Sequence, residues 1–521
     1  MTIVVVGVVF GGLAGAAFFA WPRAALGLDD AALASVALPG FAGDVADVVV
    51  HSAHGKNVPV RLRHGKLWPV HKLAVGARLT VVLTVRRPGW AGWLVGHRER
   101  RTFTIETPKA HLRGRWLEVK AGAPVTVAFD APVSAVSFGG ARTRRLAEAQ
   151  TVVPVGVVAR GPTRAGTIGV AAAARSWERL PAAASVSWFP ARPYPQLLAA
   201  PKLGAALAPD RRLTLTFSDT VRDVLGARRP TLTPSTPGRW KLLDAHTLAF
   251  RPRGLGFGLG AQVHVRLPRG VHLAGEAGTT LTRKLAWHVP QGSTLRLQQL
   301  LAQLGYLPLT WQSVGVSTPA VHEQLAAAIA PPPGQFSWRY PNIPGELQAL
   351  WNEGQPNQIT RGAVMMFQDT HGLTVDALAG PQVWKQLLAD AIAGKRRDDG
   401  YSYVYVHRNL PQSLNLWHNG QTILSSPGNT GVPSAPTQLG TFPVFEHIPS
   451  GTMSGTNPDG SHYNDPGIRY ISYFNHGDAI HAFTRSSFGT PQSLGCVELP
   501  LDSAAKVWPY TPIGTLVTVE N

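Results

Sequence analysis

The sequence has little cysteine and few acidic residues. Cys496 is the only cysteine among 521 residues, so no internal disulfide can stabilise the chain. Asp and Glu number 30 against 49 Lys and Arg, a formal net charge of +19. Such a charge usually indicates a polyanionic partner or surface. The basic residues are scattered and no RNP, zinc-finger or recognition-helix pattern accompanies them, so we predict no nucleic-acid partner. Solvated faces of β-sheets or an anionic envelope account for the charge as well.

The sequence has only one long apolar run. Ile3–Trp21 contains no charged residue and, as a helix, would span roughly 30 Å of hydrocarbon. Residues 1–22 are therefore predicted to be a membrane anchor or a secretory signal peptide. Small residues such as Ala14–Ala17 offer a cleavage site, although no Lys or Arg precedes the run. Both alternatives imply an exported protein, and an anchor would make the membrane a partner.

The sequence also lacks the spacing typical of a metal site. No His-Glu-x-x-His motif occurs, and the histidines of the N-terminal and C-terminal regions are scattered without paired spacing. We therefore predict no metal and no cofactor. The histidines considered are His51, His54, His64, His71, His447, His462 and His476.

The first 290 residues predict β modules. The chain has 54 Gly and 43 Pro, and short Val, Thr and Leu runs are separated by these residues. We predict β-sandwich modules over residues 31–108 and 109–190. A third module, residues 191–290, resembles the bacterial Ig-like modules of surface proteins through LTLTFS at 213–218 and TLAFRP at 247–252. These modules are interpreted as spacers.

Helical periodicity begins at Gln291. Leu297, Leu300, Leu301 and Leu304 recur at i, i+3, i+4 and i+7, and two later apolar groups predict helices near 363–372 and 383–388. Residues 291–393 resemble the three-helix peptidoglycan-binding domain, with a long insertion at 309–358. A purely structural bundle is the alternative. The charged stretch at 394–400, GKRRDDG, is predicted to be a linker.

The last domain, residues 401–521, is predicted to be mostly β. Asn419-Gly420 predicts a hairpin turn, and only residues 502–507 are predicted to be helical. His481 falls on one predicted strand and Cys496 directly precedes another. A cysteine nucleophile needs a base within hydrogen-bond reach, so this pair is the candidate catalytic centre.

The C-terminal motifs resemble the L,D-transpeptidase (YkuD-like) catalytic domain. The resemblance is carried by Ile480-His481 followed by SLGCV at 493–497, and by PT at 436–437, GTF at 440–442 and IGTLV at 513–517. It implies a chain that is multi-domain and mainly β. The fold expected is an N-terminal apolar helix, Ig-like β-sandwich modules, a small helical peptidoglycan-binding domain and a C-terminal catalytic domain.

The resemblance also implies a mechanism. Cys496 attacks the carbonyl that joins the third residue of a peptidoglycan stem to its terminal D-alanine, and His481 carries the proton. Gly495, Ser493 and Ala482 are predicted to support the site. The backbone N–H groups around Gly495 would hold the oxyanion, and the carbonyl of Ala482 would orient His481. The predicted substrate-binding residues are Tyr473, Arg485, Phe488 and Glu498. The thioester then passes to the side-chain amine of a neighbouring stem.

Two positions depart from the family pattern. Leu494 stands where the family often has histidine, and Glu498 stands where it often has Arg or Asn. Three rival hypotheses stay open at this point: an L,D-carboxypeptidase that hydrolyses the same bond, a non-catalytic wall-binding scaffold protein, and a sortase-like anchoring enzyme. The expected partners are peptidoglycan stem peptides and glycan, and the expected location is the extracytoplasmic bacterial cell envelope.

Overall fold

The computed structural model describes residues 22–120, 122–155, 165–274, 284–315 and 320–521. The apolar segment predicted at 3–21 lies outside these residues. Within the described ranges, no helix is both long enough and apolar enough to cross a membrane. The chain divides into two compact units: residues 1–198, 216–224 and 272–281 form unit 1, and residues 199–215, 225–271 and 282–521 form unit 2. Strands predominate over helices, so the fold is mainly β as predicted.

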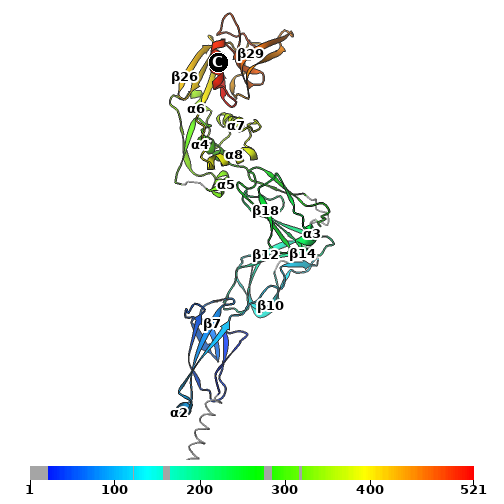
Figure 1. Cartoon of the computed structure of the whole chain (residues 1–521), viewed down its shortest axis with the longest axis vertical. Coiled ribbons are helices and arrows are strands. Elements are labelled where there is room, and N and C mark those ends of the chain that lie inside the picture. Colours follow the sequence, from blue (N-terminus) through cyan, green and yellow to red (C-terminus); the bar gives the residue numbers. More distant parts are fainter. Residues whose placement is uncertain (1–21, 121, 156–164, 275–283, 316–319) are drawn as a thin grey trace, which may run out of the picture. The chain divides into compact units, whose positions relative to one another are not determined.

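The first β module of unit 1 has two sheets with a shared core (Figure 1). One sheet has the order β1-β2-β5-β4, the other β3-β7-β8, and β6 pairs with β13. Val50 and Val81 of the second sheet share a buried cluster with Ala34 and Leu67 of the first, as in a β-sandwich. The elements are β1 Ala25–Gly27, β2 Ala34–Ala37, β3 Asp44–Ser52, β4 Val60–Arg63, β5 Lys66–Pro69, β6 Leu73–Ala74, β7 Arg78–Arg86, η1 Gly89–Ala91, α2 Gly92–Val95 and β8 Arg98–Glu106.

The second β module is built on a five-stranded sheet with the order β11-β10-β12-β14-β9. Val127, Phe129 and Val136 of β10 pack with Val186 of β14 in its core. The elements are β9 Trp116–Val119, β10 Thr126–Phe138, β11 Arg144–Pro154, β12 Gly166–Ala173, β13 Glu178–Arg179 and β14 Ala184–Pro190.

A third group of strands follows, arranged as β15-β16-β19-β18 and β17-β20-β21. Alternating burial along β16 and β20 explains the alternating sequences that predicted them. The elements are β15 Leu197–Ala200, β16 Leu213–Phe217, α3 Val221–Leu225, β17 Thr231–Thr233, β18 Gly238–Leu242, β19 Thr247–Pro252, β20 Gln262–Arg266 and β21 Lys284–His288.

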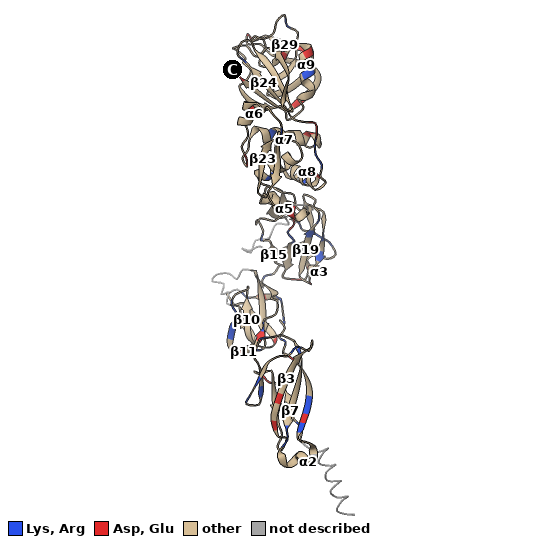
Figure 2. Ribbon diagram, turned by 90° about the vertical axis from the view of Figure 1, so that its left-hand side faces the viewer, with Lys and Arg blue, Asp and Glu red and all other residues tan. Residues whose placement is uncertain are grey.

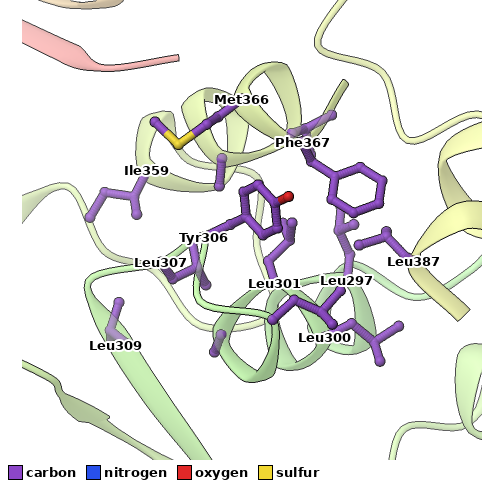
Figure 3. Packing of buried hydrophobic residues seen from close by; sticks show 14 of the residues in the cluster. Leu297, Leu300, Leu301, Tyr306, Leu307, Leu309, Ile359, Met366, Phe367 and Leu387 are labelled. Carbon is purple, nitrogen blue, oxygen red and sulfur yellow. The ribbon is translucent and has the colours of Figure 1, made fainter. Parts of the chain in front are cut away.

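The helical region of unit 2 contains the three helices that periodicity predicts: α4 Thr294–Gln303, α7 Gln358–Thr370 and α8 Pro381–Ile392. Figure 3 shows the rings of Tyr306 and Phe367 between leucines of α4 and α8, and the two ring centroids are 5.2 Å apart. The 309–358 insertion has structure of its own where it is described. It contains β22 Leu309–Ser313, α5 Val321–Ile329, β23 Gly334–Trp338 and α6 Gly345–Ala349, and it contributes Trp311 and Leu325 to the same core.

The C-terminal region has two sheets, with the orders β26-β25-β24-β32-β27 and β28-β29-β30-β31. Figure 1 shows β26 and β29 on opposite sides of this region. Val404 and Val517 of the first sheet share a buried core with Ile480 and Val497 of the second. The elements are β24 Ser402–His407, β25 Ser413–His418, β26 Gln421–Pro427, β27 Gly440–Pro443, β28 Glu446–Thr456, β29 His462–Asn475, β30 Asp478–Ala482, β31 Val497–Leu499, α9 Leu501–Val507, η2 Trp508–Tyr510 and β32 Leu516–Glu520.

The helical and C-terminal regions share one hydrophobic core. Tyr401, Trp417 and Leu516 belong to the cluster that also holds the leucines of α4. The Nε1–H of Trp417 donates to the carbonyl of Asn342 at 2.9 Å. The segment 394–400, predicted as a linker, is itself packed, because the Arg397 amide donates to the carbonyl of Leu304 at 2.8 Å. The C-terminal region is therefore joined to the helices by packing as well as by the chain.

Candidate active site

Two adjacent parallel strands position His481 and Cys496. In the register of β30 and β31, Ile480 lies opposite Val497 and His481 lies opposite Glu498. Side chains alternate between the faces of a sheet, so extending β31 by one residue places Cys496 on the same face as Glu498 and His481. His481 and Cys496 are therefore diagonal neighbours on one face of the sheet.

His481 is a buried histidine with one defined hydrogen bond. Its side chain is 3% exposed, and Nδ1 lies 3.0 Å from the carbonyl oxygen of Ala482. A carbonyl only accepts, so Nδ1 carries the proton and Nε2 keeps its lone pair. Burial lowers the pKa of His481, against the opposing effects of the Ala482 carbonyl and the Glu498 carboxylate. At neutral pH the ring is a neutral base.

Cys496 is a half-buried free thiol at the end of this sheet. Its Sγ lies 3.6 Å from the carbonyl oxygen of Gly477. The surrounding protein raises the pKa of the thiol to about 12, mainly by excluding water, and the carboxylates of Asp478 and Glu498 add to the effect while the amide of Ala479 opposes it. At rest Cys496 is therefore a neutral thiol, which would need a base to become a nucleophile.

Gly495 and Ser493 shape the turn before the nucleophile. Gly495 has φ of 117°, a conformation that L side chains rarely adopt, and a Cβ there would collide with Oδ1 of Asp478. The Ser493 hydroxyl, which is buried, donates to the carbonyl of Cys496 at 2.6 Å. The Val432 amide donates to the Ser493 carbonyl at 2.9 Å. These contacts hold the backbone on both sides of Cys496.

Glu498 is engaged inside the protein. Its carboxylate accepts from Nη2 and Nε of Arg485 at 2.6 and 2.8 Å, and its side chain is 5% exposed. Arg485 also donates to the carbonyl of Gln492 at 3.1 Å and lies over the ring of Phe483. A two-point pair of this kind fixes the loop that carries Arg485 against β31. Glu498 thus lies beside His481 and is paired with the Arg485 guanidinium.

A family comparison fits this geometry. Residues 401–519 match the YkuD family, the L,D-transpeptidase catalytic domain. A comparison with curated proteins gives no match.

Solved L,D-transpeptidase structures are also similar to this chain. One from Mycobacterium smegmatis is 12% identical, with 63% of this chain and 99% of that chain covered and a TM-score of 0.22. One from Mycobacterium tuberculosis H37Rv is 11% identical over 63% of this chain and 98% of its own, with a TM-score of 0.21. The catalytic domain of the L,D-transpeptidase from E. faecium is 25% identical, with 23% of this chain and 96% of that chain covered and a TM-score of 0.21.

The remaining predicted residues of the YkuD domain differ in how closely they approach the Cys496 thiol. Tyr473 packs in the same small cluster as Cys496, and its pKa is raised by burial and by the neighbouring cysteine. Phe488 is half-buried in the loop between β30 and β31, without a ring contact or hydrogen bond to His481 or Cys496 in the described part of the chain. Arg485 and Glu498 bind each other, as described above.

Two residues of the YkuD domain were missed by sequence reasoning. Asn429 is fully buried, and its Oδ1 accepts from the amide of Gly489 at 2.9 Å while its backbone pairs with Glu498. Asp478 lies against Gly495, and burial raises the pKa of its carboxyl. No local motif marks either residue. The position of Asp478 at the start of β30, directly after the His476-Gly477 turn, was the one available indication for this residue.

The YkuD domain has no cluster of metal ligands. Across the described residues, no group of three His, Cys, Asp or Glu side chains comes together in a way that could hold a metal ion. The Nε2–H of His447, for example, donates to the carbonyl of Trp508 at 3.0 Å, and the two rings stack with centroids 4.2 Å apart.

Proposed function

We propose that this protein is a peptidoglycan L,D-transpeptidase that forms cross-links between the third residues of stem peptides. The observation that carries the proposal is the place of His481 on β30 and of Cys496 directly before the paired strand β31 of a YkuD domain. The Ala482 carbonyl holds the histidine as a base. A neutral thiol beside a neutral imidazole suits acyl transfer, since the base takes the thiol proton as the sulfur attacks.

The first half-reaction makes an acyl-enzyme. Cys496 Sγ forms a bond to the carbonyl carbon that joins the third stem residue to D-alanine, and His481 Nε2 takes the thiol proton. The tetrahedral intermediate expels the amine of D-alanine, which receives that proton from the imidazolium. Backbone amides around Gly495 and Cys496 are the proposed oxyanion donors, each worth on the order of 3 kcal/mol in comparable sites.

The second half-reaction transfers the acyl group. The side-chain amine of a neighbouring stem attacks the thioester carbonyl and gives its proton to His481. The C–S bond then breaks and the thiolate recovers the proton, so the enzyme returns to its starting state with one new amide bond formed. No cofactor is required for these steps.

The upstream regions support this role in the proposal. Residues 291–393 would bind the peptidoglycan glycan, and the β modules at 31–108, 109–190 and 191–290 would act as a spacer. The uncharged segment 3–21 would export the chain or anchor it in the membrane. The expected location is then the extracytoplasmic side of a bacterial cell envelope.

A mass measurement tests the active site first. The full chain incubated with a carbapenem should gain one covalent adduct on Cys496, and Cys496→Ala should gain none. An unmodified wild-type mass would contradict catalysis and favour the scaffold hypothesis. Muropeptide analysis with a disaccharide-tetrapeptide substrate should then give cross-linked dimers; release of D-alanine without dimers would replace this proposal by the carboxypeptidase.

A further inference from the structure

The three most exposed aromatic side chains of the described residues lie in two loops of the first β module. Trp93 is 78% exposed, Phe41 is 72% exposed and Trp90 is 63% exposed. The rings of Phe41 and Trp90 are in edge contact, with centroids 6.2 Å apart. Single exposed apolar residues are ordinary on protein surfaces, whereas a group of large ones marks a contact surface.

Strand register shows that both loops leave the same end of the module. Phe41 lies in the connection from β2 to β3, and both tryptophans lie in the connection from β7 to β8. Asp44 at the start of β3 pairs with Arg86 at the end of β7, which pairs with Arg98 at the start of β8. Figure 1 shows α2 at this end. We call Phe41, Trp90 and Trp93 the aromatic tip.

The loop that carries the tryptophans is held by its own hydrogen bonds. The Arg87 amide donates to the carbonyl of His97 at 3.0 Å, and its guanidinium donates to the carbonyl of Val95 and to Glu99. The Ala91 amide donates to the carbonyl of Pro88 at 2.9 Å. The backbone that carries Trp90 and Trp93 is therefore preorganised, which lowers the conformational entropy lost on binding.

The chain also enters the module at this end. Ala25 at the start of β1 pairs with Ala37 at the end of β2, directly before the loop that carries Phe41. Ala24 is fully buried and its carbonyl accepts from Arg101 of β8. The nineteen residues of the uncharged segment 3–21 immediately precede this point in the sequence.

Cations surround the aromatic tip. Arg23, Arg86 and Arg98 are exposed at this end of the module, and Asp44 is the exposed acidic residue paired across from Arg86. Figure 2 shows basic residues, with some acidic residues among them, on the strands next to α2. Tryptophan favours the boundary between lipid headgroups and hydrocarbon, and arginine is attracted to anionic headgroups.

We propose that the aromatic tip rests in the headgroup layer of an anionic lipid bilayer. The proposal goes beyond the transpeptidase function and does not depend on it. Segment 3–21, acting as an anchor, would by itself leave the first module free to rotate relative to the membrane. Contact at the aromatic tip would fix the orientation of the module.

Site-directed fluorescence on the full chain tests this contact. In a Cys496→Ser background, Trp93→Cys carries an environment-sensitive NBD label, and the protein is reconstituted in vesicles that contain phosphatidylglycerol. The matched control is His54→Cys, an exposed position beyond Ser52 at the opposite end of the same sheet, where Ser52 pairs with Leu79. The nine residues of β7 separate the two ends by roughly 30 Å.

The label at position 93 should shift to shorter wavelength, and lipids spin-labelled near the headgroup should quench it at least threefold more than the label at 54. Adding Phe41→Ser and Trp90→Ser should abolish the difference, and Arg86→Gln with Arg98→Gln should reduce it. Equal emission and quenching at 93 and 54 would overturn the proposal. An unchanged signal in vesicles of phosphatidylcholine alone would overturn its electrostatic part.

Discussion

Glu498 and Arg485 form a two-point ion pair beside the candidate catalytic histidine, with oxygen–nitrogen distances of 2.6 and 2.8 Å. Glu498 lies opposite His481 in the parallel register, and Arg485 follows His481 by four residues in the connecting loop. The pair therefore joins the loop before Cys496 to the strand after it.

Removing the arginine should destabilise the YkuD domain. Arg485→Ala leaves the buried Glu498 carboxylate without its cation, which should cost about 3 kcal/mol, the low end for buried pairs because Arg485 is partly exposed. Thermal unfolding of the domain measures this cost. Arg469→Ala removes an exposed arginine from β29 and should change the stability by less than about 0.5 kcal/mol. Equal effects of the two substitutions would contradict a structural pair.

The pH dependence of the acylation rate should be that of a neutral thiol beside a neutral imidazole. Because burial lowers the pKa of His481 from 6.5, the unprotonated base persists to lower pH, and the acid limb of the rate profile should lie below pH 6.5. Because the pKa of the Cys496 thiol is raised to about 12, the thiol keeps its proton at lower pH values. Thiol ionisation should therefore cause no fall of the rate below about pH 12. Stopped-flow acylation by a carbapenem measures the rate on the acid and the alkaline side.

Loss of the base should slow acylation strongly. His481→Asn should reduce the rate by roughly 10²–10⁴-fold and remove the acid limb, since the general base would be gone. Alkylation of Cys496 by iodoacetamide should be slow at pH 7 and accelerate towards alkaline pH. Fast alkylation at pH 6 would show a resting thiolate–imidazolium pair and contradict the neutral-pair mechanism.

The glycine before the nucleophile should not tolerate a side chain. Gly495→Ala places a Cβ at φ of 117° and against Asp478 Oδ1, with an expected cost of about 1–3 kcal/mol. The matched control is Gly477→Ala, because a Cβ at Gly477 meets no atom within 4 Å. Adduct formation and melting temperature should fall for the first variant and stay near wild type for the second. In the double variant Gly495→Ala with Asp478→Ala, only the part of the stability loss that comes from the collision with Asp478 should be recovered.

Packing between α7 and the segment before β32 should also depend on glycine. A Cβ on Gly362 would collide with the carbonyl oxygen of Gly514, so Gly362→Ala should cost about 1–3 kcal/mol. Gly345→Ala in α6 meets nothing within 4 Å and should be neutral or stabilising. Limited proteolysis between 394 and 400 should become faster only in Gly362→Ala. Unchanged proteolysis would contradict the shared core as the joint between the two regions.

Local pattern in the sequence was enough for several elements. The leucine period predicted α4, and the Asn419-Gly420 turn predicted the hairpin of β25 and β26. The strand β28 was missed because Pro449, Gly451 and Gly455 interrupt a mostly polar run. The helices and strands inside the 309–358 insertion were not predicted either. They are short, and their buried residues share a core with α4.

By itself, the sequence determined which residues are the candidates for the site. Cys496, His481 and Gly495 lie in one short stretch with a recognisable order. Only the tertiary structure decided which groups surround them. Asn429 comes from a distant loop, Asp478 meets Gly495 across the sheet, and Glu498 pairs with Arg485. Such contacts depend on strand register and on long-range packing, which spacing along the chain does not encode.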